Sequence, residues 1–204
     1  MVKTDKKDTT EEKILTAAKN VFLRKGMAGA RMQDIADEAG INKALLHYYF
    51  RNKEKLFDVI FKESSMLFFP RITGIIESDN SLYEKIEAFC AAYIELLLQN
   101  PYLPLFVLNE VNKQPQRFKQ KFWKNREQIF TMFADNILSE IQNKKIKSVN
   151  PAHLIMNMIS MCIFPFIAKP LWMMTTGMSD SAFKAFAEER KKIIPQLIIE
   201  SIKK

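Results

Sequence analysis

The stretch Arg31-Met-Gln-Asp-Ile-Ala-Asp-Glu-Ala-Gly-Ile-Asn-Lys-Ala-Leu-Leu-His-Tyr-Tyr-Phe50 decides the expected fold of this chain. Apolar residues recur at helical spacing on both sides of Gly40, which predicts two short helices, 32–39 and 43–50, joined by a tight turn. An earlier helix should begin at Thr10 and end at Gly26, whose freedom at positive φ suits a helix C-terminus. These three helices have the layout of a helix-turn-helix, whose second helix enters the major groove of DNA.

The helix expected at 43–50 has an inner face and an outer face. A projection at about 100° per residue puts Leu46, Tyr49 and Phe50 on the inner side. The outer side carries small, apolar and hydrogen-bonding residues, namely Lys43, Ala44, Leu45, His47 and Tyr48. Alanine allows close backbone approach, leucine can meet a thymine methyl, and the polar tips can donate to phosphates or base edges. An ordinary three-helix corner with solvated polar residues remains the alternative.

Two further cations stand at expected helix starts. Lys53 begins a long helix that Asn52 can cap, and the first backbone amides of that helix offer a phosphate site. Arg31 precedes the helix at 32–39 in a similar way.

Residues 10–57 resemble the DNA-binding domain of TetR-family (tetracycline-repressor-like) transcription regulators. The resemblance rests on Ile14-Leu-x-Ala-Ala, Val21-Phe22, Lys25-Gly26, Met32-x-Asp-Ile-Ala36, Ala39-Gly-Ile41, Lys43, Leu46-x-x-Tyr-Phe50 and Asn52-Lys-Glu-x-Leu56. It covers about a quarter of the chain. The rest is similar to the family only in architecture, as an all-helical body of the expected length.

The resemblance implies contacts to DNA at particular positions. Phosphate contacts would fall on Arg31, Asn42, His47, Tyr48 and Lys53, and base contacts on Gln33, Lys43, Ala44 and Leu45. The chain departs from the family pattern at four of these positions. Arg31 stands where the family often has Thr or Ser, Ala44 where Gly is common, Leu45 where Thr or Ser is common, and His47 where Tyr is usual. These departures suggest an operator that is read partly by apolar contact.

The composition favours a mostly helical chain with a large core. Of 204 residues, 48% are hydrophobic, and only 5 Gly and 8 Pro accompany 16 Phe and 11 Met. The net charge of +8 suits an anionic partner such as nucleic acid or a membrane surface, although a basic proteome would give the same value. Cys90 and Cys162 lie in apolar patterns, which indicates buried thiols in a reducing cytoplasm. Residues 1–8 lack the apolar stretch of a signal peptide, and the longest apolar run, 154–168, falls short of a bilayer span.

The expected fold class is all-α, with two domains. Residues 1–57 should form the DNA-binding domain, with a disordered arm at 1–9 and the helix-turn-helix at about 31–50. Residues 58–204 should form a larger helical domain for ligand binding and dimerisation. Its expected helices, after one at 53–69 that Pro70 disrupts, are 82–99, 102–113, 114–142, 152–168 and 179–202, with 172–178 as a connection.

A pocket for a small inducer in the larger domain follows from the resemblance. The candidate lining residues, chosen by helix and composition, are Phe61, Phe68, Cys90, Tyr93, Phe106, Asn109, Phe130, Met132, Met156 and Asn157. Methionine-rich linings adapt to varied apolar ligands, yet an aromatic or Met stripe at helical spacing is also typical of plain core. Asn157 is the sharpest candidate, because a buried amide needs a partner, which a ligand, another helix or a second copy could supply.

The last two long helices are those that the resemblance assigns to a homodimer interface. Packed in pairs around a twofold axis, they would form a four-helix bundle through Met158, Met161, Phe164, Phe183, Phe186, Ile194 and Leu197. The competing interpretation is that both helices fill the core of a monomer. The dimer is favoured, because one reading helix covers only a few base pairs and a twofold mate supplies the rest.

An enzyme is not expected from this sequence. His47 and His153 are the only histidines, and the chain has no glycine-rich phosphate loop, nucleophile elbow or HExxH motif. We therefore expect no catalytic residue, no cofactor and no metal.

Together these features predict a cytoplasmic homodimeric repressor with no membrane partner. It would bind a near-palindromic double-stranded DNA operator and be released by an apolar or amphipathic small molecule. The alternative is a helical scaffold or membrane-surface adaptor that uses the segment 113–126. That segment combines basic and aromatic residues, namely Lys113, Arg117, Phe118, Lys119, Lys121, Phe122, Trp123, Lys124 and Arg126.

Overall fold

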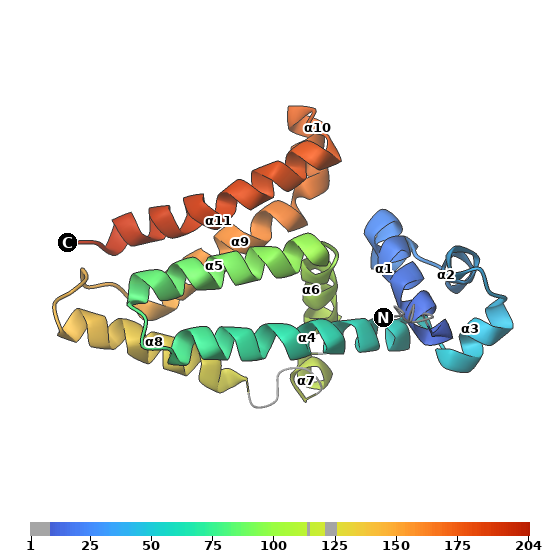
Figure 1. Ribbon diagram of the computed structural model, residues 1–204, viewed down its shortest axis with the longest axis horizontal. Helices are drawn as coiled ribbons and strands as arrows, with labels where there is room; N and C mark the ends of the chain where they lie inside the picture. The colour runs from blue at the N-terminus through green and yellow to red at the C-terminus, as the bar shows by residue number, and fades with distance from the viewer. Residues whose placement is uncertain (1–8, 114, 121–125) are drawn as a thin grey trace, which may run out of the picture. The chain divides into compact units, whose positions relative to one another are not determined.

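The computed structural model describes residues 9–113, 115–120 and 126–204, which form helices with short connections (Figure 1). The helices are α1 (Thr10–Gly29), α2 (Met32–Ala39), α3 (Lys43–Tyr49), α4 (Lys53–Glu77), α5 (Leu82–Gln99), α6 (Leu103–Lys113), α7 (Pro115–Phe118), α8 (Glu127–Gln142), α9 (Pro151–Ile167), α10 (Lys169–Thr176) and α11 (Asp180–Ile202). An isolated antiparallel bridge joins Ile146 to Lys203. The predicted all-α class is confirmed.

The chain divides into two compact units, the first ending at Ser64 and the second beginning at Ser65. Both residues lie inside α4, so the first unit holds α1, α2, α3 and the start of α4. The sequence prediction placed the boundary in the same helix, after Phe57.

Local sequence signals set the helix boundaries of the first unit. The Thr9 hydroxyl accepts from the backbone N–H of Glu12, and the Glu12 carboxylate accepts from the Thr9 N–H, which closes a capping box at the start of α1. Gly26, at φ 65°, interrupts the helical backbone where the sequence predicted an end, although helical structure resumes to Gly29. Gly40, at φ 66°, ends α2 in the left-handed conformation that glycine adopts without strain.

The core of the first unit is formed where α1, α2, α3 and α4 bury their apolar faces. Ile14, Val21 and Phe22 of α1 are buried, as are Ile35 of α2 and Leu46 of α3. The Phe22 and Phe57 rings lie 5.8 Å apart, centre to centre. Such burial is the main favourable term in folding, and each large apolar side chain contributes about 1.5–3 kcal/mol.

Two aromatic residues of this unit differ from their predicted places. Phe61 was expected to line the ligand pocket of the larger domain, but it is only 8% exposed in the first unit and its ring stacks on Phe57 at 6.3 Å. Tyr49 was expected to pack inward beside Leu46 and Phe50, but it is exposed and meets Tyr48 edge to face at 5.6 Å. Leu46 and Phe50 suffice to cover the inner side of α3.

The prediction that Pro70 disrupts α4 is wrong, because the helix continues to Glu77. Pro70 has no amide to donate to the carbonyl of Met66, one turn earlier. The Met66 side chain lies on an exposed part of the helix, where water can replace the missing donor. Beyond the proline, Ile72 and Ile76 are buried in the core of the second unit, which stabilises the continued helix.

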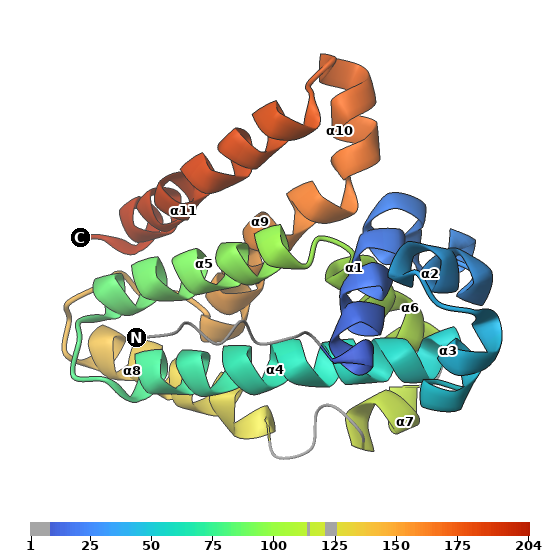
Figure 2. The same ribbon diagram turned by 45° about the vertical axis from the view of Figure 1, so that its right-hand side comes forward.

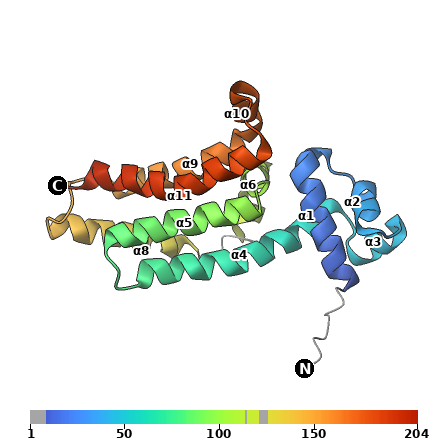
Figure 3. The ribbon, with the colours of Figure 1, turned by 45° about the horizontal axis from the view of Figure 1, so that its top comes forward.

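Three long helices, α5, α9 and α11, pack together in the second unit, and α8 also packs on α5 and α9 (Figures 1 and 3). Aromatic pairs join the helices: Phe89 stacks on Phe133 at 6.0 Å, and Phe166 meets Phe183 edge to face at 5.7 Å. Cys90 and Cys162 are buried free thiols, as predicted.

Two elements of the second unit differ from the prediction. The long helix expected at 114–142 is not continuous, because Arg126 lies outside any helix and α8 begins at Glu127. The connection expected at 172–178 is largely helical, since α10 spans Lys169–Thr176 and leads from α9 to α11 (Figure 2). Gly177, at φ 68°, ends α10.

A buried lysine links three helices of the second unit. The Lys85 ammonium on α5 donates to the carbonyl of Ile76 at 2.8 Å, near the end of α4, and to the side-chain oxygen of Asn136 on α8. The Asn136 amide in turn donates to the Met132 carbonyl at 2.8 Å. The charge is thus hydrogen-bonded to oxygen atoms, as burial of an ammonium group requires.

Candidate nucleic-acid interface

Polar contacts join α2 to α1, and a backbone hydrogen bond closes the turn between α2 and α3. The Arg24 guanidinium binds the Glu38 carboxylate through two hydrogen bonds, at 3.2 and 2.5 Å. Lys25 pairs with Asp34 at 2.8 Å. The Ile41 amide donates to the Ala36 carbonyl at 3.0 Å, across the turn at Gly40. These contacts fix α2 and the turn from which α3 begins.

The outward face of α3 is the one that the sequence predicted. Leu46 is fully buried behind the helix, whereas Tyr48 is 83% exposed. The other residues predicted to face DNA from this helix, Lys43, Ala44, Leu45 and His47, are exposed as well. The structure therefore gathers a cation, a small residue, an apolar side chain and two aromatic hydrogen-bonding groups on one surface.

Two side chains of this surface also have structural contacts. The side-chain oxygen of Asn42 accepts from the Leu45 amide at 2.8 Å and caps α3. The His47 Nδ1 lies 3.0 Å from the Arg51 carbonyl oxygen. A carbonyl oxygen only accepts, so this contact places a proton on Nδ1 and leaves Nε2 as the second polar atom of the ring.

The predicted contact residues on α2 flank this surface. Arg31 is exposed, and its backbone N–H donates to the Asp34 carboxylate at 3.0 Å. Gln33 is exposed too, and its side-chain amide donates to Asp37 at 2.7 Å.

Lys53 does not extend into solvent as a phosphate contact would. Its ammonium group donates to the carbonyl oxygens of Met27 at 2.8 Å, Ala28 at 3.4 Å and Ala30 at 3.2 Å. The residue is half-buried at the corner between α1 and α2. Asn52 does cap α4 as predicted, since its side-chain oxygen accepts from the Lys55 amide at 2.8 Å.

The predicted pocket residues of the second unit fall into two groups. Buried or half-buried residues are Phe68, Cys90, Tyr93, Phe106 and Met132, and exposed residues are Asn109, Phe130, Met156 and Asn157. The prediction of a buried Asn157 amide is wrong for the single chain. Asn157 lies two turns before the exposed Phe164, on the same face of α9. Hydrophobicity alone does not tell which face of an apolar helix is left uncovered.

Inside the second unit, Tyr93 packs between two phenylalanines, with ring centres 5.2 Å from Phe68 and 5.7 Å from Phe89. Burial raises the pKa of the Tyr93 phenol above its ordinary value. The described residues supply no hydrogen-bond partner to its hydroxyl group. A hydrogen bond to Cys162, together with burial, likewise raises the pKa of Cys90, so this thiol stays protonated.

The residues predicted for a dimer interface also fall into a buried group and an exposed or half-buried group. Met158, Phe183 and Ile194 are buried in the core of the single chain and are not available to a second copy. Phe164 is 65% exposed and Leu197 is 55% exposed, with Met161 and Phe186 half-buried beside them. The core interpretation therefore holds for the buried faces of these helices, and the dimer interpretation stays a prediction for their exposed faces.

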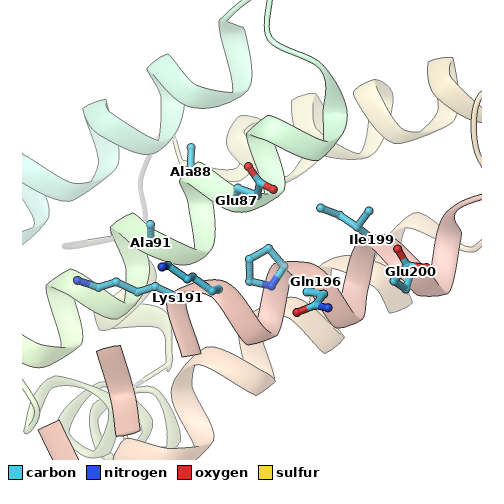
Figure 4. A pocket seen from close by; sticks show the side chains of 9 residues that line it. Glu87, Ala88, Ala91, Lys191, Gln196, Ile199 and Glu200 are labelled. Atoms are coloured by element: carbon cyan, nitrogen blue, oxygen red, sulfur yellow. The ribbon is translucent and has the colours of Figure 1, made fainter. Parts of the chain in front are cut away.

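A groove that the sequence did not indicate lies between α5 and α11, with a volume of about 660 Å³ (Figure 4). Its apolar lining comes from Ala88, Ala91, Pro195 and Ile199, and its polar lining from Glu87, Lys191, Lys192, Gln196 and Glu200. Lys191 is already paired with Glu95 at 2.5 Å and with Glu188 at 2.7 Å. The small side chains of Ala88 and Ala91 leave room on α5, but the groove exists only because α11 packs beside them.

Other kinds of site find little support in the part of the chain that the structure describes. It holds no cluster of three or more His, Cys, Asp or Glu side chains that could bind a metal ion. No single described helix is long and apolar enough to cross a membrane, and two bent pairs, α5 with α6 and α9 with α10, reach that length only together.

The basic segment 113–126 of the adaptor hypothesis is only partly described. Lys121, Phe122, Trp123 and Lys124 lie outside the described residues. Phe118 is buried rather than presented on a surface. The Arg126 guanidinium lies 3.9 Å from the centre of the Phe69 ring.

Comparisons with known proteins agree with this geometry. Residues 14–60 match the family of bacterial regulatory proteins of the tetR type. The chain is 41% identical over 56 residues to the transcriptional repressor NicS of Pseudomonas putida, a match that spans 28% of this chain and only 26% of that relative. It is 26% identical over 147 residues to the fatty acid metabolism regulator protein of Bacillus subtilis, across 72% of this chain and 75% of the relative.

Solved structures share the fold along nearly the whole chain. The ketosteroid transcriptional regulator KstR2 of Mycobacterium tuberculosis has a TM-score of 0.71 at 18% identity, with 98% of this chain and 97% of that chain covered. The regulator FadR of Bacillus subtilis in complex with stearoyl-CoA has a TM-score of 0.60 at 19% identity, with 89% and 96% covered.

The fold and the exposed α3 face define a helix-turn-helix transcriptional regulator with a large helical second unit. The family match within α1–α4 makes the assignment specific. Residues 14–60 are those of a tetR-type bacterial regulatory protein by the family match, and the fold of the whole chain is that of solved regulators of this type. Members of this family are regulators, not enzymes.

The ion pairs between α1 and α2 predict that the first unit loses stability in acid. The Lys25 hydrogen bond lowers the pKa of Asp34, and the Arg24 hydrogen bond lowers the pKa of Glu38. A carboxyl pKa that is lower in the folded state contributes stability above the unfolded pKa of about 4, and the contribution is lost as the pH falls through the folded pKa. Thermal unfolding by circular dichroism should show a shallower loss of stability in acid for the double variant Asp34→Asn, Glu38→Gln than for the wild type. The exposed control Glu54→Gln should follow the wild type, and equal slopes for all three proteins would contradict the prediction.

Proposed function

We propose that this chain is a homodimeric repressor that binds a near-palindromic operator through α3 and is released by an apolar or amphipathic small molecule. The observation that carries the proposal is the exposed face of α3, which presents Lys43, Ala44, Leu45, His47 and Tyr48 together. Such a protein acts where bacterial DNA lies, in the cytoplasm.

The individual contacts follow from chemistry and position. Ala44 allows the α3 backbone to approach the base edges closely, and Leu45 can contact a thymine methyl. Lys43 and Tyr48 can donate to base edges or phosphates, and the cap residue Asn42 and His47 can contact phosphates at the two ends of the helix. Arg31 and Gln33 add contacts from the start of α2.

A first prediction concerns α3. An operator selected from random duplexes should be an inverted repeat, and Lys43→Ala and Tyr48→Ala should each weaken its binding by about tenfold, because each loses contacts worth about 1–3 kcal/mol. Fluorescence anisotropy of the labelled operator measures both affinities. Lys184→Ala, an exposed cation on α11, is the control. Survival of full affinity in both α3 variants would show that this helix does not read DNA.

The proposed dimer uses the exposed face of α9 and α11. Phe164 and Leu197 are large, apolar and more than half exposed, and Ile193 is exposed beside Leu197. Met161 and Phe186 border this face, and Asn157 lies on the same side of α9, where it can hydrogen-bond to a second copy. A twofold pairing of the two helices would bury this face in a four-helix bundle.

The dimer proposal predicts that one charge in this face separates the subunits. Phe164→Glu or Leu197→Glu should give a monomer, because a glutamate buried at the twofold axis faces its own copy. Leu67→Glu is the matched control, since Leu67 is 80% exposed on α4 and lies outside the face. Analytical ultracentrifugation gives the masses. A monomeric wild type, or dimeric Glu variants, would place the interface elsewhere.

The proposed ligand belongs to the second unit. One structural relative was solved with stearoyl-CoA and another is named for ketosteroids. The first ligand joins a long apolar chain to a charged coenzyme A group, the second class is largely apolar, and both carry carbonyl oxygens. Here the buried Phe89 and the half-buried Phe68 and Tyr93 form an aromatic group, and no described residue is hydrogen-bonded to the Tyr93 hydroxyl. A ligand carbonyl would satisfy that donor.

A ligand screen should compare long-chain acyl-CoA thioesters, free fatty acids and ketosteroids. We expect one class to release the operator and to raise the melting temperature, since a ligand stabilises the state that it binds. Tyr93→Phe should weaken that response by about fivefold, the value of one net hydrogen bond, without changing operator affinity. Coenzyme A without an acyl chain is the control. An operator complex that resists all three classes would argue against an apolar inducer.

A further inference from the structure

The ammonium group of Lys53 completes the end of α1 from another helix. The last four carbonyls of a helix have no partner within it, and basic side chains often supply one. The last turn of α1 contains no basic residue. Lys53, the first residue of α4, instead donates to the carbonyls of Met27 and Ala28 in that turn, and to Ala30 just beyond it.

These contacts use the full donor capacity of the side chain. An ammonium group has three N–H donors, and three backbone oxygens lie within 3.4 Å of the Lys53 Nζ. To contact a DNA phosphate, Lys53 would have to leave all three oxygens without their donor.

The carbonyl site lies directly before the start of α2. Ala30 is buried and is followed by Arg31, and Gln33 lies within the first turn of α2. The position of the corner between α1 and α2 therefore sets where these two side chains stand relative to α3. No other cation is hydrogen-bonded to these three carbonyls among the described residues.

We propose that Lys53 is a positioning residue for DNA reading, which fixes the corner between α1 and α2 and does not bind a phosphate. This inference rests on the proposed operator-binding function. A phosphate contact supports binding to every DNA sequence equally. A positioning residue instead supports the arrangement of the side chains that contact bases, which favours the operator alone. Loss of Lys53 should then lower the preference for the operator over unrelated DNA.

Salt dependence separates these two roles. Each protein cation that neutralises a phosphate adds about 0.9 to the slope of log affinity against log salt concentration, because a counterion is released. A lysine that is bound to carbonyls in both free and DNA-bound protein adds nothing to that slope.

The test compares Lys53→Met with Lys43→Met and Lys62→Met. Lys62 is an exposed cation further along α4, outside the proposed interface. Anisotropy titrations against the selected operator and against an unrelated duplex, at several salt concentrations, give both affinities and slopes. We expect Lys53→Met to bind the operator about tenfold more weakly, the loss of about one charged hydrogen bond, with little change on the unrelated duplex and an unchanged slope. Lys43→Met should reduce the slope by about 0.9, and Lys62→Met should match the wild type.

Amide hydrogen exchange of the free proteins provides a readout that needs no DNA. Lys53→Met should exchange faster at the corner between α1 and α2 than Lys62→Met does, and Lys53→Arg, which can still donate to carbonyls, should restore both protection and operator preference in part. If Lys53→Met fails to fold, Lys53→Gln, which keeps an amide donor without the charge, undergoes the same comparisons.

Three results would overturn the proposal. They are a slope reduced by about 0.9 with equal losses on both duplexes, exchange at the corner that matches Lys62→Met, and an operator preference that does not change. A wild type that selects no operator would refute the proposed function instead, and the exchange data would still decide whether Lys53 holds the corner.

Discussion

The orientation of α3 depends on the burial of Leu46. This side chain is fully covered by the core of the first unit, with Phe50 buried one turn later. A helix with its inner side fixed in this way has its outer side fixed as well, because its residues advance by about 100° each. Lys43, Ala44 and Tyr48 are exposed for that reason. The surface that we propose to read DNA is therefore a consequence of apolar packing on the opposite side of a seven-residue helix.

Polar contacts between helices add to the apolar core in fixing the positions of the helices. The pairs Arg24–Glu38 and Lys25–Asp34 join α1 to α2, and Lys53 joins α4 to the end of α1. Exposed ion pairs stabilise a fold only slightly. Their effect here is on geometry, since each one fixes the position of α2 against its neighbours. In the second unit, Lys85 has a comparable place, because its hydrogen bonds join α5 to the end of α4 and to α8.

The two faces of α9 and of α11 in the second unit differ in burial. The inner faces of α9 and α11 supply Met158 and Ile194 to the core, and the outer faces leave Phe164 and Leu197 uncovered. A large exposed apolar surface is typical of an interaction site. Composition could not separate the two faces, because α9 is apolar nearly all round and its periodicity is correspondingly weak.

The sequence by itself determined the helix-turn-helix, the cap of α4 at Asn52, the turn at Gly40 and most of the outward face of α3. These features follow from contacts between residues close in the chain, where spacing and residue type decide the outcome. Only the tertiary structure decided that α4 continues through Pro70, that Phe61 belongs to the first unit and that Asn157 is exposed. It also decided that Lys53 contacts three carbonyls of α1. Each of these outcomes depends on partners distant in sequence, whose positions exist only once the helices have packed.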